Sequence, residues 1–82
     1  MNKKDERGGD EMKVVGKSVG EKLVNLRAEK TQREVAEAVG ISISALAMYE
    51  SGQRIPRDEV KVRLARYFGA SIEEIFFARN VH

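Results

Sequence analysis

The stretch that decides the fold is TQREVAEAVGISISALAMYESGQ, residues 31–53, which predicts two short helices joined by a tight turn. Thr31 is a candidate N-cap for the first helix, and Glu34 has the spacing that completes a capping box. Gly40 supplies the positive φ that commonly ends a helix, and Ser42 can cap the second helix. Two helices joined by a short turn that contains glycine are typical of a helix-turn-helix unit.

Both helices have an apolar stripe at helical spacing, which we expect to face a common core. The stripes consist of Val35, Ala36 and Val39 in the first helix and of Ala45, Leu46 and Tyr49 in the second. The small side chain of Ala36 would let the second helix cross the first closely. We expect the second helix to end over Glu50, Ser51 and Gly52.

Three further helices are predicted around this pair. The first begins at Ser18, with Glu21 completing a capping box, and runs to about Ala28. Its buried face is expected to consist of Val19, Leu23 and Leu26. Gly20 lies inside this helix, where it would cost about 1 kcal/mol relative to alanine.

The last two helices follow residue 57. The fourth is predicted over residues 58–68 and ends at Gly69. Ser71 caps the fifth, with Glu74 completing its capping box. The inner faces are expected to consist of Val60, Leu64, Ala65 and Phe68 in the fourth helix and of Ile72, Ile75 and Phe76 in the fifth. The side chains expected to face outward from the fourth helix are Lys61, Arg63 and Arg66.

Length and composition narrow the class of protein. The 82 residues suit one small domain, and an apolar content of 41% with few aromatic residues suits an all-helical core. The chain contains no cysteine, which excludes disulfides and thiolate metal sites. No apolar run approaches the roughly 18 residues that span a bilayer, and no secretory signal stands at the start. We therefore expect a cytoplasmic protein without a membrane partner.

The side chains that usually carry out catalysis or bind metals are too few and too scattered to predict an enzyme. The only histidine is His82, and the acidic residues are scattered over helix faces that we expect to be solvated. No group of side chains is therefore expected to act together in acid–base catalysis or in metal binding. Gly16, Lys17 and Ser18 match the end of a phosphate loop, but Glu11 stands where that motif requires glycine. We expect no catalytic residue, no cofactor and no metal.

The segments TQREVAEAVGIS, YESGQRIP and YFGASIEEIFF resemble the Xre/Cro-type helix-turn-helix family, which includes phage repressors of the lambda type. The resemblance covers about residues 18–77 and keeps the family's order of motifs. It implies an all-α, compact five-helix lambda-repressor-like DNA-binding domain that usually works as a dimer.

The ends of the chain are expected to form tails. Residues 1–17 are charged, mixed in sign and poor in apolar side chains, which is typical of a flexible N-terminal tail. The alternative is an arm that contacts DNA through Lys3, Lys4 and Arg7, although acidic residues lie beside them. Residues 78–82 would form a short C-terminal tail.

The sequence departs from the family between the first two helices. Only residues 28–30 precede Thr31, about two fewer than in family members, which place a large apolar residue there. The first helix is therefore expected to end earlier or to pack at a different angle. The resemblance also implies a structural ion pair between Arg27 and Glu50, the glutamate that closes the recognition helix.

The second helix of the pair carries the expected reading face. The resemblance assigns base contacts in the major groove to Ile43, Ser44, Ala47 and Met48, on a recognition helix over residues 42–50. None of them is an arginine, lysine, asparagine or glutamine, the side chains that bind bases in bidentate fashion. Ser44 can hydrogen-bond a base edge and the others can pack on thymine methyl groups, so we expect readout by methyl contacts and DNA shape. The alternative is that Ile43 and Met48 belong to the core or bind another protein.

Neutral and basic donors flank the recognition helix. Gln32 stands at the start of its helix, where free N–H groups and the helix dipole favour an anion. The segment from Ser51 to Arg57 contains no acidic residue, and Pro56 gives it an extended turn. The expected phosphate contacts are Gln32, Ser42, Ser51, Gln53, Arg54 and Arg57.

Together these features predict a sequence-specific transcriptional regulator that binds double-stranded DNA, a repressor of phage, mobile-element or bacterial Xre type. A homodimer on a palindromic operator would place two recognition helices about 34 Å apart. Phe77 suits a dimer contact, with added core packing as the alternative. The alternative function is an antitoxin or co-regulator of the same fold, whose main partner is a regulatory protein. An operator-binding assay with and without that partner separates the two functions.

Overall fold

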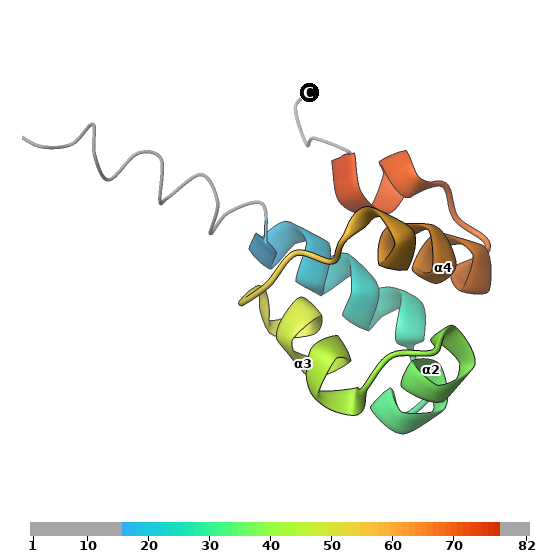
Figure 1. The fold of residues 1–82 in the computed structure, drawn as a ribbon. Helices are drawn as coiled ribbons and strands as arrows, with labels where there is room; N and C mark the ends of the chain where they lie inside the picture. The colour runs from blue at the N-terminus through green and yellow to red at the C-terminus, as the bar shows by residue number, and fades with distance from the viewer. Residues whose placement is uncertain (1–15, 78–82) are drawn as a thin grey trace, which may run out of the picture.

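The computed structural model describes residues 16–77, and every regular element in that range is a helix (Figure 1). The N-terminal helix covers residues 16–27. It is followed by α2 (Gln32–Val39), α3 (Ile43–Ser51), α4 (Asp58–Phe68) and the π-helix η1 (Glu73–Phe77). The prediction of a compact all-α fold with five helices is confirmed. Residues 1–15 and 78–82, with the proposed arm and most of the expected tails, lie outside the described residues.

Local capping signals fix several of the helix ends that the sequence predicts. The Thr31 hydroxyl accepts from the Glu34 N–H at 3.0 Å, and the Glu34 carboxylate accepts from the Thr31 N–H at 2.9 Å. The same reciprocal pair joins Ser71 and Glu74. The glycines that end α2, α3 and α4 with a positive φ are Gly40, Gly52 and Gly69. The predicted capping boxes at Thr31 and Ser71 are therefore confirmed.

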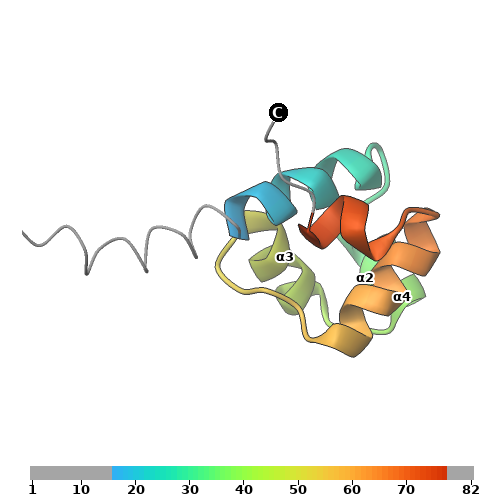
Figure 2. The same ribbon diagram turned by 90° about the horizontal axis from the view of Figure 1, so that it is seen from above.

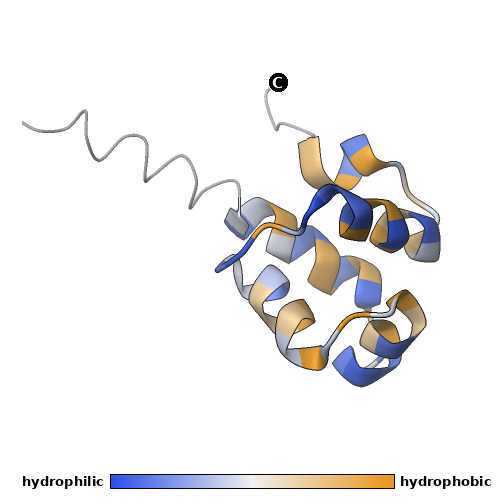
Figure 3. Ribbon diagram, viewed as in Figure 1, coloured by the Kyte–Doolittle hydropathy of each residue, from blue (hydrophilic) through white to orange (hydrophobic). Residues whose placement is uncertain are grey.

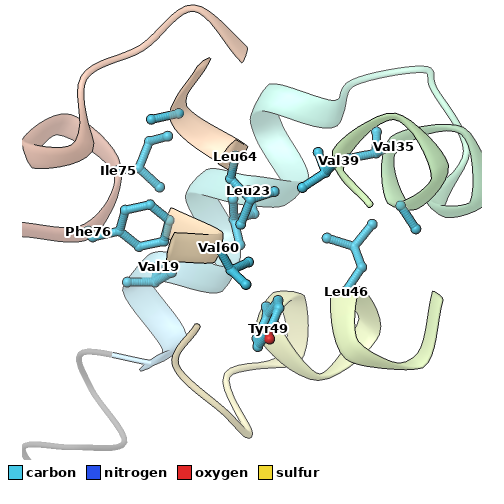
Figure 4. Close-up of a cluster of buried hydrophobic side chains, with 12 residues drawn as sticks. Val19, Leu23, Val35, Val39, Leu46, Tyr49, Val60, Leu64, Ile75 and Phe76 are labelled. Atoms are coloured by element: carbon cyan, nitrogen blue, oxygen red, sulfur yellow. The ribbon is translucent and has the colours of Figure 1, made fainter. Parts of the chain in front are cut away.

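The core is one apolar cluster around the N-terminal helix. In Figure 1, α2 and α3 lie below this helix and α4 and η1 lie above it. Figure 2 shows the N-terminal helix along one edge of the molecule with α3, α4 and η1 on the same side of it, and α2 also contacts α4. Leu23 and Leu64 meet near the middle of the cluster (Figure 4), and both are fully buried. The buried members are Val19, Leu23, Val35, Ala36, Val39, Leu46, Tyr49, Val60, Leu64, Ala65, Ile75 and Phe76. The expected core residues that are only partly buried beside them are Ala45, Phe68 and Ile72.

The N-terminal helix differs from the prediction at two residues. Residues 16 and 17 are already helical, so Ser18 lies inside the helix and its predicted role as N-cap is wrong. Leu26, expected in the core, is 37% exposed. Leu23 already fills the core one turn earlier, and the short connection brings no large apolar residue that could cover Leu26.

A left-handed residue closes the short connection to α2. Ala28 has a φ of 54°, the only positive φ among the non-glycine residues that the structure describes. The Lys30 N–H donates to the Arg27 carbonyl oxygen at 3.0 Å, and Arg27 Nη1 donates to the Lys30 carbonyl oxygen at 2.8 Å. The helix therefore ends at residue 27, within one residue of the predicted end at about Ala28.

Gly20 is required by a close approach of two backbones. A Cβ at Gly20 would lie 2.2 Å from the Glu50 carbonyl oxygen and 2.9 Å from that of Tyr49. A Cβ at Gly16 would lie 2.7 Å from the Gly52 carbonyl oxygen. The N-terminal helix thus packs directly on the last turn of α3. The expected advantage of alanine at position 20 does not apply in this packing.

Lys61 does not face outward as predicted. Its side chain is only 14% exposed, and its Nζ lies 3.7 Å from Asp58 Oδ1. The same Nζ lies 5.8 Å from the ring centroid of Phe76 and 5.0 Å from that of Phe77. Cation–π attraction holds the charge at the edge of the core, and the aliphatic stem covers apolar surface. The prediction of an outward Lys61 is therefore wrong.

Candidate nucleic-acid interface

The turn between α2 and α3 holds α3 at the surface. Ala36 is fully buried in α2, and its carbonyl oxygen accepts from the N–H groups of Gly40 and Ile41. Ser42 Oγ then accepts from the Ala45 N–H at 2.9 Å and starts α3. These contacts fold the chain back sharply, so that one face of α3 packs on α2 and the core while the other stays outside.

The four residues expected to contact bases lie on the outward side of α3. Ile43 is 38% exposed and Met48 is 37% exposed. Ser44 is also exposed, whereas Ala47 is half-buried. The ribbon of α3 is mostly white to orange in Figure 3, so the helix as a whole is apolar in composition. The alternative that Ile43 and Met48 belong to the core of the chain is wrong.

The charge beside this face is positive. Glu50 is the only acidic residue from Ile43 to Arg57, and its side chain is only 6% exposed. Arg54 and Arg57 both have exposed positions in the segment after α3. The segment after α3 therefore presents two cationic groups, and neither this segment nor the reading face has an exposed carboxylate, which favours a polyanion as the partner.

Arg27 and Glu50 form a bidentate ion pair between the N-terminal helix and α3. Arg27 Nε lies 2.7 Å from Glu50 Oε2, and Arg27 Nη2 donates to Glu50 Oε1 at 3.1 Å. The hydrogen bond to Glu50 raises the pKa of the Arg27 guanidinium above its usual value, against the opposing effect of burial. The pair neutralises the only carboxylate of α3.

Gln32 makes a contact that the sequence does not predict. Its Nε2 donates to Glu50 Oε1 at 2.8 Å. The two residues lie 18 positions apart, and no local motif links them. The sequence shows only that a glutamine begins one helix and that a glutamate lies near the end of the next. This predicts a contact only when the relative positions of the two helices are known. Because a primary amide has two N–H groups, Gln32 keeps a second donor.

The other candidate phosphate contacts lie at the two ends of α3. Ser42 Oγ accepts within its cap and retains its own hydroxyl hydrogen for donation. Ser51 Oγ instead donates to the Met48 carbonyl oxygen at 3.2 Å, which engages its hydrogen inside α3. The N–H groups of Gln53 and Arg54 donate to the same carbonyl oxygen at 2.9 and 3.3 Å. This anchors the segment that leads from α3 toward Arg57.

Residues 16–77 hold neither a candidate metal site nor a membrane-spanning helix. Within this range, no three histidine, cysteine or acidic side chains are grouped so as to hold a metal ion. None of the helices described there combines the length and the apolar character that crossing a membrane requires. His82 lies outside the range.

Comparison with known proteins points to the same part of the chain. The family model described as "Helix-turn-helix" matches residues 22–75. The chain is 37% identical over 59 residues to the "Cryptic phage CTXphi transcriptional repressor RstR" of Vibrio cholerae serotype O1 (strain ATCC 39315 / El Tor Inaba N16961), which covers 70% of this chain and 53% of that protein. It is 34% identical over 56 residues to a protein of the same description from Vibrio cholerae, which covers 66% of this chain and 50% of the relative. The chain thus spans about half the length of the curated relatives it matches. No solved structure matches.

Proposed function

The chain belongs to the helix-turn-helix family, as a DNA-binding transcriptional regulator of the lambda-repressor-like type, and from that premise we propose that it represses transcription by placing α3 in the major groove of an operator. The observation that carries this proposal is the outward face of α3. Ile43 and Met48 are exposed on it, while the only carboxylate between Ile43 and Arg57, on Glu50, is largely covered and paired with Arg27. A regulator of this kind acts where the DNA is, so we propose a cytoplasmic location.

We propose that bases are read by Ile43, Ser44, Ala47 and Met48. Three of these side chains are apolar, and only Ser44 can hydrogen-bond a base edge. Thymine is the base that offers a methyl group in the major groove. The half-site is therefore expected to be recognised through thymine methyl groups and through sequence-dependent DNA shape.

We propose that phosphate contacts surround this face. The residues concerned are Gln32, Ser42, Ser51, Gln53, Arg54 and Arg57. Arg54 and Arg57 supply the charge, and their exposure leaves them able to reach the DNA backbone. Ser51 contributes as a donor only if its hydroxyl leaves the Met48 carbonyl oxygen. Affinity should fall steeply with salt, because each neutralised phosphate releases a counterion.

We also propose that two copies bind a palindromic operator together. The support is Phe77, which is 57% exposed at the end of η1 and lies beside the Lys61 ammonium group. An exposed aromatic ring of this kind is a common anchor of a protein interface. A two-fold pair would place the two α3 helices about 34 Å apart, one turn of the duplex.

Selection of bound sequences from random duplex DNA tests the proposal. The full chain should enrich a palindrome, and the double variant Ile43→Asp with Met48→Asp should lose at least 100-fold in affinity while its circular dichroism stays helical. The control is Val24→Asp with Leu26→Asp, which adds the same charge at comparably exposed apolar residues of the N-terminal helix. It should bind as the unchanged chain does.

Three results would contradict the proposal. The first is a folded Ile43→Asp and Met48→Asp variant that still binds the selected duplex, which would remove the assigned face. The second is enrichment only when a second protein is present, which would favour the antitoxin or co-regulator function. The third is enrichment without palindromy, which would remove the two-fold arrangement.

A further inference from the structure

Glu50 contacts two side chains from two other helices at once. Its Oε2 accepts from Arg27 Nε at 2.7 Å, and its Oε1 accepts from both Arg27 Nη2 and Gln32 Nε2, at 3.1 and 2.8 Å. We infer that Glu50 is a positioning residue for DNA binding: it fixes the Gln32 amide in the orientation in which that amide donates to an operator phosphate. This inference rests on the proposed function.

A carboxylate restricts the glutamine in a specific way. An ionised carboxylate only accepts hydrogen bonds, so it selects the amino end of the Gln32 amide and not the carbonyl end. The Glu50 side chain is only 6% exposed, and a charge-assisted hydrogen bond in such surroundings is stronger than one in water. Without it, the Gln32 side chain would rotate freely and lose entropy on binding DNA.

The second N–H of the same amide then lies at a suitable place. Gln32 is the first residue of α2, and the free N–H groups of a helix start favour an anion. With one N–H held by Glu50, the other remains for a phosphate oxygen. Arg27 completes the arrangement because it neutralises Glu50, whose unpaired charge would repel that phosphate.

A purely structural role for Glu50 makes a different prediction. If Glu50 only ties α3 to the N-terminal helix, its loss lowers stability, and the contribution of Gln32 to DNA affinity stays unchanged. If Glu50 positions Gln32, the two residues are coupled in DNA binding. A double-mutant cycle measured on binding, with stability measured separately, distinguishes the two roles.

The cycle uses a background in which the ion pair is replaced by apolar residues. Arg27→Met with Glu50→Met removes both charges together, and such replacements of buried pairs are often neutral or stabilising. Gln32→Ala should lower affinity for the selected duplex about tenfold in the unchanged chain, as the loss of a hydrogen bond to a charged group does. In the Met background the same change should alter affinity less than about twofold.

Gln53→Ala is the matched control for this cycle. Gln53 is an exposed glutamine that is also proposed to contact phosphate, and it has no side-chain hydrogen bond to Glu50. Its effect on affinity should be the same in both backgrounds. Phosphate-ethylation interference supplies the site-specific readout. In the unchanged chain, ethylation of the phosphate that Gln32 contacts should lower binding. Ethylation of that phosphate should no longer lower binding in Gln32→Ala, and it should no longer do so in the Met background.

Nitrogen-15 relaxation of the unchanged chain tests the inference without any variant, should the Met background fail to fold. The Gln32 side-chain amide of the DNA-free protein should be as ordered as the backbone of α2, whereas Gln53 should be mobile. A freely rotating Gln32 amide overturns the inference, and so does an equal Gln32→Ala effect in both backgrounds. If the unchanged chain selects no duplex, the proposed function fails as well. If it selects one and the cycle shows no coupling, only this inference fails.

Discussion

Gly20 and Glu50 meet backbone to backbone, with only 2.2 Å between the Glu50 carbonyl oxygen and the place where a Cβ on Gly20 would stand. Observed Cβ atoms essentially never approach another atom closer than 3.0 Å. Since the obstructing atom is a backbone oxygen, no side-chain rotation can relieve the contact. Gly20 therefore sets the distance between the N-terminal helix and the last turn of α3.

Gly20→Ala should destabilise the protein, although alanine is the better helix former by about 1 kcal/mol. The clash forces the helices apart, and overpacking of this kind typically costs about 1–3 kcal/mol. Urea unfolding followed by circular dichroism measures the change. The control is Asn25→Ala, an exposed position in the same helix, which should stay within about 0.5 kcal/mol of the unchanged chain. Equal stability of the two variants would show that the helices separate without cost.

Ala28→Gly should stabilise the protein. Ala28 has a φ of 54°, and the left-handed conformation costs a non-glycine residue about 1–2 kcal/mol. Glycine removes that strain but gains about 0.4–1 kcal/mol of entropy in the unfolded chain, so the net gain should be about 0.5 kcal/mol. The melting temperature should rise by a few degrees. Ala38→Gly, at an exposed position inside α2, should lower it instead. A fall in both variants would mean that Ala28 is not strained.

Replacement of thymine by deoxyuridine in the selected half-site should weaken binding. Each lost methyl contact is expected to cost about 0.8 kcal/mol, or about fourfold in affinity. The variant Ile43→Ala with Met48→Ala should bind both duplexes about equally, because it lacks the side chains that are proposed to pack on the methyl groups. Gln53→Ala, at a position proposed to contact phosphate, should retain the full preference for thymine. Equal affinity of the unchanged chain for both duplexes would exclude methyl readout.

Phe77→Ala should weaken dimerisation and leave the protomer stable. Phe77 is 57% exposed in the single chain, so its removal should change the free energy of unfolding of the protomer by no more than about 0.5 kcal/mol. Aromatic anchors of interfaces commonly contribute 2 kcal/mol or more, so the dissociation constant should rise at least about tenfold. Sedimentation equilibrium measures it, with Leu26→Ala as an exposed apolar control. An unchanged dimer with a destabilised protomer would assign Phe77 to core packing.

The features of the fold that can be predicted from the sequence are contacts between residues a few positions apart in the chain. The reciprocal bonds of Thr31 with Glu34 and of Ser71 with Glu74 join residues three positions apart, so their spacing is visible in the sequence. The apolar stripes are visible for the same reason, because helical periodicity repeats within one turn. The family resemblance supplied the order of the helices and the positions of the reading face.

The parts that the sequence does not predict depend on residues far apart in the chain. Gly20 reads as a weak helix residue until Glu50 is placed against it. The bond from Gln32 to Glu50 likewise requires α2 and the end of α3 to be positioned first. Lys61 reads as an outward lysine, yet the rings of η1 draw its ammonium group inward. The contacts of Gly20 and Gln32 have no local signal, whereas the spacing of Lys61 from Leu64 and Ala65 places it on the inner face of α4.

The backbone of Met48 anchors the segment after α3, whereas its side chain is proposed to contact a base. Its carbonyl oxygen receives the N–H groups of Gln53 and Arg54, and this anchor does not depend on which side chain position 48 carries. The side chains of Ile43, Ser44 and Ala47 likewise take part in no cap or ion pair within the described chain. If these four residues read bases as proposed, substitutions at Ile43, Ser44, Ala47 and Met48 should change the target sequence and leave the capping contacts of α3 in place.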